Sequence, residues 1–150
     1  MSGGRRMFMF SAAVFAVLRR GDEVLALRRS GTGWCDGFWS VPAGVHDGAE
    51  PLWAGAAREL CEETGVEVDP EAALLLHVQH NFTDGAEWVG FYFGFDRWTG
   101  EPWRREPEKH DIVAWRRPDK IADRMIPYVA SALAGIAAGR THSSYRDVEG

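Results

Sequence analysis

The sequence predicts an α/β fold in which one mixed sheet lies between helices. Three observations predict it. Short apolar runs typical of strands recur along the chain, two stretches hold helix-forming residues between a proline and a glycine, and 150 residues suit one domain. No repeat or linker divides the chain, so we expect a single domain over residues 1–150, with flexible ends at 1–6 and 140–150.

The first strand is expected within the apolar run Met7–Leu18, which has a pair of arginines on each side. A basic segment before an apolar run also begins secretory signals, but twelve residues are too few to span a bilayer. A second run, Glu23–Arg28, follows a turn at Gly21-Asp22. Two strands joined by that turn explain both runs, so we favour a hairpin over a signal or a membrane segment.

The remaining elements follow from the same reasoning. The expected elements are a short strand at Phe38–Val41, strands at Ala72–His80 and Trp88–Trp98 joined by a hairpin loop at Asn81–Ala86, a strand at Asp111–Arg116 and a helix at Ile126–Ala138.

The segment Gly44–Val66 predicts a helix that carries the chemistry of the protein. Pro51 suits the first helical turn and Gly65 is a natural stop, with strong helix formers between them. At helical spacing one face is expected to pack on the core; its members are Trp53, Ala56, Ala57, Leu60 and Thr64.

Glu59, Glu62 and Glu63 stand at i, i+3 and i+4, so their carboxylates gather on another face of this helix. Three like charges repel one another, and a hard divalent cation neutralises them through the oxygen ligands that Mg²⁺ prefers. The alternative is a solvated acidic face in which Arg58 pairs with Glu62. Because Gly44 and Glu50 also stand at fixed distances upstream, we favour the metal site.

Written as spacing, the segment is G-x5-E-x7-R-E-U-x-E-E-x-G-U, with U a bulky aliphatic residue. It resembles the signature of the Nudix hydrolases, with every defined position filled. This segment, Gly44–Val66, is called the box below. The resemblance implies an α/β/α sandwich and hydrolysis of a nucleoside diphosphate linked to another group. It implies that the metal, Mg²⁺ or alternatively Mn²⁺, is held by Glu59, Glu62, Glu63 and the Gly44 carbonyl. Glu50 and Arg58 would brace the loop and orient Glu59.

The resemblance therefore gives Glu50, Arg58, Glu59 and Glu62 as catalytic residues, and leaves open which carboxylate acts as the general base. A second stretch, residues 97–106 (RWTGEPWRRE), is similar to a run in the MutT nucleoside triphosphate pyrophosphatases. There the last glutamate is an additional metal ligand, which implies Glu106 here, with Glu108 as the fallback.

The MutT-like run favours a (deoxy)nucleoside triphosphate as the substrate, with 8-oxo-dGTP as one candidate. In MutT enzymes an asparagine before the last helix reads the base; here that place falls on Met125, beside Arg124. Trp34 and Trp39 flank the entry to the box and are interpreted mainly as packing residues, with base stacking as the alternative. We retain Arg124, Met125 and Trp39 as substrate-binding residues.

Two alternatives stay open. One is an ADP-ribose or nucleotide-sugar pyrophosphatase; the other is a non-catalytic nucleotide-binding regulator of the same family. ADP-ribose hydrolases usually have a proline about fifteen residues past the box, and none lies between Glu71 and Arg97.

The composition of the chain limits the classes of molecule that it is expected to bind. A net charge of −5 and a pI near 5.5 argue against binding duplex DNA, but not against a nucleotide held through metal. Two cysteines are too few for a disulfide framework, so we expect reduced thiols in the cytoplasm and no membrane association. Seven tryptophans suit a homodimer interface as well as a large core.

Overall fold

The computed structural model describes residues 4–147. Its strands are β1 Ser11–Arg20, β2 Glu23–Arg29, β3 Trp39–Ser40, β4 Ala43–Val45, β5 Leu74–Thr83, β6 Ala86–Phe95, β7 His110–Arg116 and β8 His142–Arg146. Its α-helices are α1 Leu52–Thr64, α2 Pro118–Ile121 and α3 Pro127–Ala137, and two short 3₁₀ helices are η1 Pro70–Ala72 and η2 Ala122–Arg124.

The strands form one mixed sheet in the order β3-β2-β1-β6-β5-β8, with β4 also paired to β1 and β7 to β2. β1 runs parallel to β6, from Ser11 opposite Trp88 to Leu18 opposite Phe95, and β8 runs parallel to β5. The other pairings are antiparallel. The predicted mixed-sheet α/β fold is confirmed.

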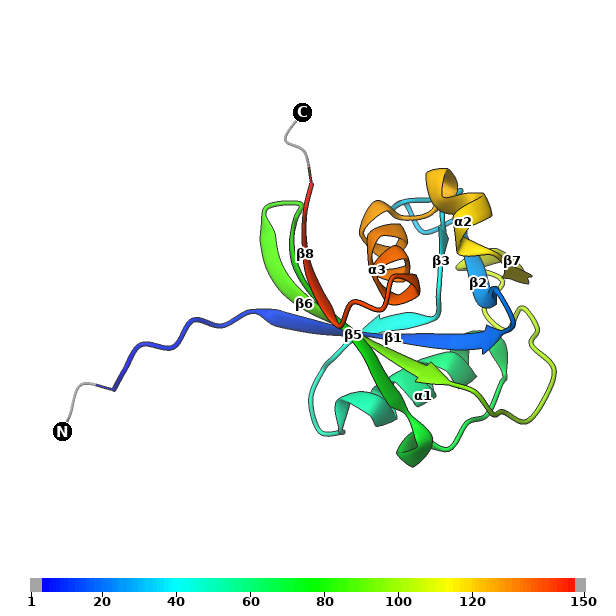
Figure 1. The fold of residues 1–150 in the computed structure, drawn as a ribbon, viewed down its shortest axis with the longest axis horizontal. Helices are drawn as coiled ribbons and strands as arrows, with labels where there is room; N and C mark the ends of the chain where they lie inside the picture. The colour runs from blue at the N-terminus through cyan, green and yellow to red at the C-terminus, as the bar shows by residue number, and fades with distance from the viewer. Residues whose placement is uncertain (1–3, 148–150) are drawn as a thin grey trace.

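Alternate side chains of β1 enter two separate cores, as the two-residue period of a strand requires. Leu18 and its neighbours on one face pack with Leu60 of α1, while Phe15 and Val17 on the other face pack with Leu133 of α3. Helices α1 and α3 therefore cover opposite faces of the sheet (Figure 1). β1 is buried on both sides, which explains its continuous apolar run.

Helix α1 begins after Pro51 and ends at Gly65, as predicted. Gly65 adopts φ 75°, a left-handed conformation that favours glycine, and its N–H donates to the Cys61 carbonyl at 2.8 Å. The predicted packing face is confirmed for four of its members, Ala56, Ala57, Leu60 and Thr64, which are buried. Trp53 differs, since it is 39 % exposed at the edge of the helix.

The two ends of the chain differ from the expectations. The prediction of a flexible tail is wrong for residues 142–146, because they form β8 on the edge of the sheet; residues 148–150 lie outside the described residues. β1 begins only at Ser11, so residues 7–10, which belong to the predicted run, lie outside the observed strand. Residues 4–6 have no regular structure, and residues 1–3 lie outside the described part.

Across residues 4–147, none of the helices has the length and apolar character needed to cross a bilayer.

Candidate active site

Arg58, on α1, connects three carboxylates of the box. Its Nη2 donates to Glu50 Oε1 at 2.8 Å, and its Nη1 donates to Glu59 Oε1 at 3.1 Å and to Glu62 Oε1 at 3.2 Å. The hydrogen bond from Arg58 holds the pKa of Glu50 below its ordinary value. These are the contacts that bracing of the loop and orientation of Glu59 would require, and both roles stay predictions.

Gly44, on β4, lies against the carboxylate of Glu59. β4 pairs with β1, with Gly44 opposite Val14, so this loop is attached to the sheet beside α1. A Cβ on Gly44 would overlap the Glu59 carboxylate and lie 2.9 Å from its Cγ. Any side chain at this position would displace Glu59, which gives a physical reason for the glycine of the box.

Glu63 is buried, with 8 % of its surface exposed, and its Oε2 accepts a hydrogen bond from the Ala43 N–H at 3.0 Å. Burial raises the pKa of Glu63 well above its ordinary value, and the charge of Glu59 raises it further. Burial also raises the pKa of Glu59, against the lowering effect of Arg58. The negative charge of these two carboxyls is therefore only partly compensated by the protein.

The donor set fits a hard divalent cation, because it consists of carboxylate oxygens on one helix face with excess negative charge. Within residues 4–147 no three His, Cys, Asp or Glu side chains already converge on a common point as a metal-binding group. Mg²⁺ needs few protein ligands, since it keeps several waters and shares its shell with substrate phosphates. Glu59, Glu62 and Glu63 therefore remain predicted ligands, together with the Gly44 carbonyl.

Glu106 lies beside the box glutamates, although it is more than forty residues away in sequence. Its loop packs on the end of α1: the Trp103 N–H donates to the Thr64 carbonyl at 3.0 Å, and Arg105 Nη1 donates to the Cys61 carbonyl at 2.8 Å. The charge of Glu106 raises the pKa of both Glu59 and Glu63.

Glu108, the fallback ligand, is exposed and does not contribute to the pKa of either box glutamate. The Glu106 carboxylate pairs with Lys109 at 3.5 Å, and its role as a metal ligand stays a prediction.

A cleft of about 410 Å³ opens beside Gly44 on the α3 face of the sheet. Four aromatic residues line it: Phe15 from β1, Trp34 from the loop after β2, Trp88 from β6 and Tyr128 from α3. Trp88 and Tyr128 meet edge to face with their ring centroids 4.9 Å apart, and the Arg29 guanidinium lies 4.9 Å from the centroid of Trp34. Such a cleft can hold a flat aromatic group beside Gly44.

Sequence reasoning missed Trp88 and Tyr128 as cleft residues. Trp88 stands in an apolar strand, where burial is the usual reading, and Tyr128 gave no signal beyond its place after the helix proline. Trp34 was interpreted as packing, but it is 41 % exposed and lines the cleft.

The predicted substrate contacts lie elsewhere. Trp39 and Met125 are 5 % and 1 % exposed and belong to the core below α3, where the Ile126 N–H donates to the Trp39 carbonyl at 2.9 Å. Neither lines the cleft, so both must be corrected to core positions in this structure. Arg124 is exposed on η2 and does not line the cleft either; its role as a base contact stays an untested prediction.

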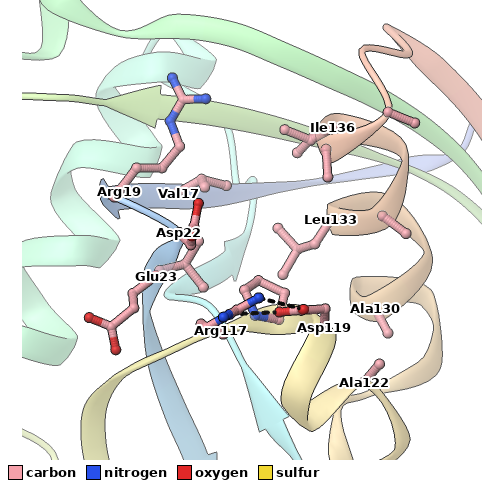
Figure 2. A pocket seen from close by; sticks show the side chains of 16 residues that line it. Val17, Arg19, Asp22, Glu23, Arg117, Asp119, Ala122, Ala130, Leu133 and Ile136 are labelled. Carbon is pink, nitrogen blue, oxygen red and sulfur yellow. Dashed lines mark hydrogen bonds and ion pairs between the residues drawn. The ribbon is translucent and has the colours of Figure 1, made fainter.

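A larger hollow of about 870 Å³ lies at the other end of β1, between the β1–β2 turn and α3. Figure 2 shows Leu133 and Ile136 on its α3 side and the Arg117–Asp119 ion pair, 2.9 Å long, below. No residue of Gly44–Val66 lines it, whereas Gly44 lines the smaller cleft. Size alone therefore does not identify the active site, and the smaller cleft beside Gly44 is the candidate.

Comparison with known proteins gives the family. The family model of the NUDIX domain matches residues 8–134. The chain is 32 % identical over 117 residues to a MutT-like protein of Streptomyces ambofaciens, covering 78 % of this chain and 70 % of the relative. It is 27 % identical over 108 residues to the phosphatase NudJ of Escherichia coli strain K12, covering 70 % of each chain.

Solved structures agree. The MutT NUDIX hydrolase from Burkholderia pseudomallei superposes with a TM-score of 0.75 at 26 % identity, covering 85 % of this chain and 98 % of that one. With the domain model matching most of its length, the chain belongs to the Nudix family, whose hydrolases act on phosphorus-containing anhydrides.

Proposed function

We propose that this Nudix hydrolase converts a (deoxy)nucleoside triphosphate into the monophosphate and pyrophosphate, with Mg²⁺ or alternatively Mn²⁺, in the cytoplasm. The observation that carries the proposal is the aromatic-lined cleft that ends at Gly44, because Gly44 lies against Glu59. A base between Trp34, Trp88 and Tyr128 would extend its polyphosphate toward the box carboxylates.

Each residue of the site has a separate proposed role. Glu59, Glu62, Glu63 and Glu106 would hold the cation, which when bound supplies Lewis acidity and lowers the pKa of water. Arg58 keeps Glu59 turned toward Gly44 through the 3.1 Å contact to its carboxylate.

In the reaction, the oxygen of a water molecule bonds to a phosphorus of the chain while the bond from that phosphorus to the bridging oxygen breaks. The proton of the water goes to a box carboxylate, and the bridging oxygen leaves with the departing phosphate group. Arg29 lines the cleft and would add positive charge near the polyphosphate of the substrate.

The test is a product analysis. The protein is incubated with Mg²⁺ and a panel of dNTPs, 8-oxo-dGTP, ADP-ribose and nucleotide sugars, and the nucleotides are separated by chromatography. Inorganic pyrophosphatase is added to half of each sample before phosphate is measured. We expect monophosphate from triphosphates and phosphate only after pyrophosphatase.

Two other outcomes would replace the proposal. AMP from ADP-ribose or a monophosphate from a nucleotide sugar, with triphosphates untouched, would make the protein a pyrophosphatase for those substrates. Nucleotide binding without turnover anywhere in the panel would make it a binding module.

A further inference from the structure

Residues Met7–Phe10, here called the arm, are four consecutive large apolar residues on the surface. Their exposed fractions are 76 % for Met7, 71 % for Phe8, 82 % for Met9 and 50 % for Phe10. Figure 1 shows the arm reaching away from the body of the molecule beyond β1. Contiguous exposed apolar surface of this kind marks an interaction site in soluble proteins.

The arm is not paired within its own chain. The parallel ladder between β1 and β6 starts at Ser11 and Trp88, so residues before Ser11 form no ladder with β6. At its root, Phe10 stacks on His80 of β5 with centroids 6.1 Å apart. His80 in turn lies 4.6 Å from Phe82, and the Arg146 guanidinium of β8 lies 4.1 Å from the centroid of Phe82.

A hollow of about 530 Å³ lies at the same end of the sheet, between the β5–β6 hairpin and β8. Phe82 and Ala86 give it apolar walls, Glu87 and Asp147 give it carboxylates, and Arg146 adds one guanidinium. Glu87 Oε2 lies 2.6 Å from His80 Nε2, and Asp147 accepts a hydrogen bond from the Asp84 N–H at 2.8 Å. The hollow therefore combines an apolar surface with two carboxylates against one guanidinium.

We propose that the arm binds this hollow in a second copy of the chain, and that two copies exchange arms about a twofold axis at this end of the sheet. The arm is basic and then apolar, with Arg5 and Arg6 directly before Met7. The hollow is apolar through Phe82, and its Glu87 and Asp147 carboxylates outnumber the Arg146 guanidinium. A twofold arrangement uses the same two surfaces of both copies and so closes after two.

Charge and position favour a second copy over a lipid surface. A chain with net charge −5 is repelled overall by anionic headgroups, so two arginines give little net attraction. A membrane would also leave the hollow without a role, although it lies at the same end of the sheet as the arm.

The experiment is sedimentation of the full chain from about 1 to 100 μM, the range in which weak dimers separate from monomers. We expect a concentration-dependent dimer. Phe8→Ser with Phe10→Ser, and separately Phe82→Ser, should each weaken self-association at least tenfold. Leu75→Ser is the matched control, because Leu75 is 57 % exposed near the other end of β5, and it should change nothing.

Charge exchange tests the pairing itself, with a melting curve for each variant because Glu87 contacts His80 and Asp147 accepts from the Asp84 N–H. Arg5→Glu with Arg6→Glu should abolish the dimer, and adding Glu87→Lys with Asp147→Lys should restore it. A monomer at every concentration would overturn the proposal. So would a dimer that survives loss of the arm, or a monomer that binds anionic phospholipid vesicles through the arm.

Discussion

Glu63 is a buried carboxyl whose surroundings favour its protonated form, because Glu59 and Glu106 add negative charge around it. Its folded-state pKa is above the ordinary value of 4.5, so the folded protein binds more protons than the unfolded chain. Stability of the metal-free protein is therefore lost as the pH rises from about 4.5 through the folded pKa.

We predict that Glu63→Gln stabilises the metal-free protein at pH 8, since it removes the buried charge and keeps an acceptor for the Ala43 N–H. The melting temperature should rise, because the fold no longer has to hold a poorly compensated buried charge. Thermal melting in EDTA measures it. Glu62→Gln is the control, since the Glu62 side chain is 49 % exposed and its removal should matter little. Equal melting temperatures for wild type and Glu63→Gln at pH 8 would contradict the prediction.

We expect a substitution of Gly44 to lower activity more than stability. Gly44→Ala places a methyl group where the Glu59 carboxylate lies, so Glu59 must turn away. We expect kcat/KM to fall about 100-fold, the size of effect that a misplaced catalytic group causes, while the melting temperature changes by a few degrees. Steady-state kinetics beside a melting curve measure both. Retained activity in a folded Gly44→Ala protein would show that Glu59 tolerates displacement.

The residues of the box could be predicted from sequence because they are local: helical spacing alone places Glu59, Glu62 and Glu63 on one face of α1. The cleft could not be predicted from the sequence. Trp88 and Tyr128 meet only because β6 and α3 pack together, and no local pattern encodes that contact. Met125 was assigned to the substrate by counting from Pro127, but its side chain turns into the core.

At the scale of elements, the loop between β6 and β7 is attached to the end of α1. The antiparallel bridge between Glu67 and Thr99 and the packing of Trp103 over Gly65 hold it there. This attachment places Glu106 next to the box.

We predict that Glu106→Gln lowers kcat/KM at least tenfold and raises the Mg²⁺ concentration needed for half-maximal rate, because it removes one negative charge beside Glu59 and Glu63. Glu108→Gln is the matched control, since Glu108 is an exposed glutamate in the same loop, and it should behave as wild type. The reverse result, with Glu108→Gln impaired and Glu106→Gln active, would transfer the ligand role to Glu108.

Most elements were predicted within a few residues, because Pro51, Gly65 and Pro127 mark helix ends by their own backbone preferences. β8 could not be predicted. Its sequence, HSSYR, is polar and lacks strand periodicity, and it is a strand only because β5 offers it an edge. The β5–β6 turn is also tighter than expected, at Asp84-Gly85, where both residues have positive φ.

At the scale of the whole molecule, the sheet joins distant parts of the chain. β1 and β6 are parallel neighbours although some seventy residues separate them, and β4 pairs on the same β1. This order brings Gly44, α1 and the cleft to one end of β1. Strand order of this kind depends on the packing of both helices and is not written in any local pattern.

We predict that Mg²⁺ stabilises the whole protein more at pH 8 than at pH 5. At the higher pH more of Glu59 and Glu63 is ionised in the folded state, and a bound cation relieves their repulsion. At pH 5 protons compete for Glu59 and Glu63, whose pKa values are raised. A saturating cation at 100 times its Kd adds about 2.7 kcal/mol. Melting curves with and without Mg²⁺ at the two pH values measure the difference, and equal shifts would contradict it.

The proposed function requires that the box glutamates form the catalytic metal site for pyrophosphate hydrolysis. The most direct measurement is the rate of monophosphate formation from a dNTP as Mg²⁺ is increased, for wild type and Glu63→Gln. We predict that the wild-type rate rises and saturates, while Glu63→Gln stays at least about 100-fold slower at saturating Mg²⁺, as loss of a metal-coordinating charge implies. Equal rates for the two proteins, or a wild-type rate that does not depend on the cation, would contradict the claim.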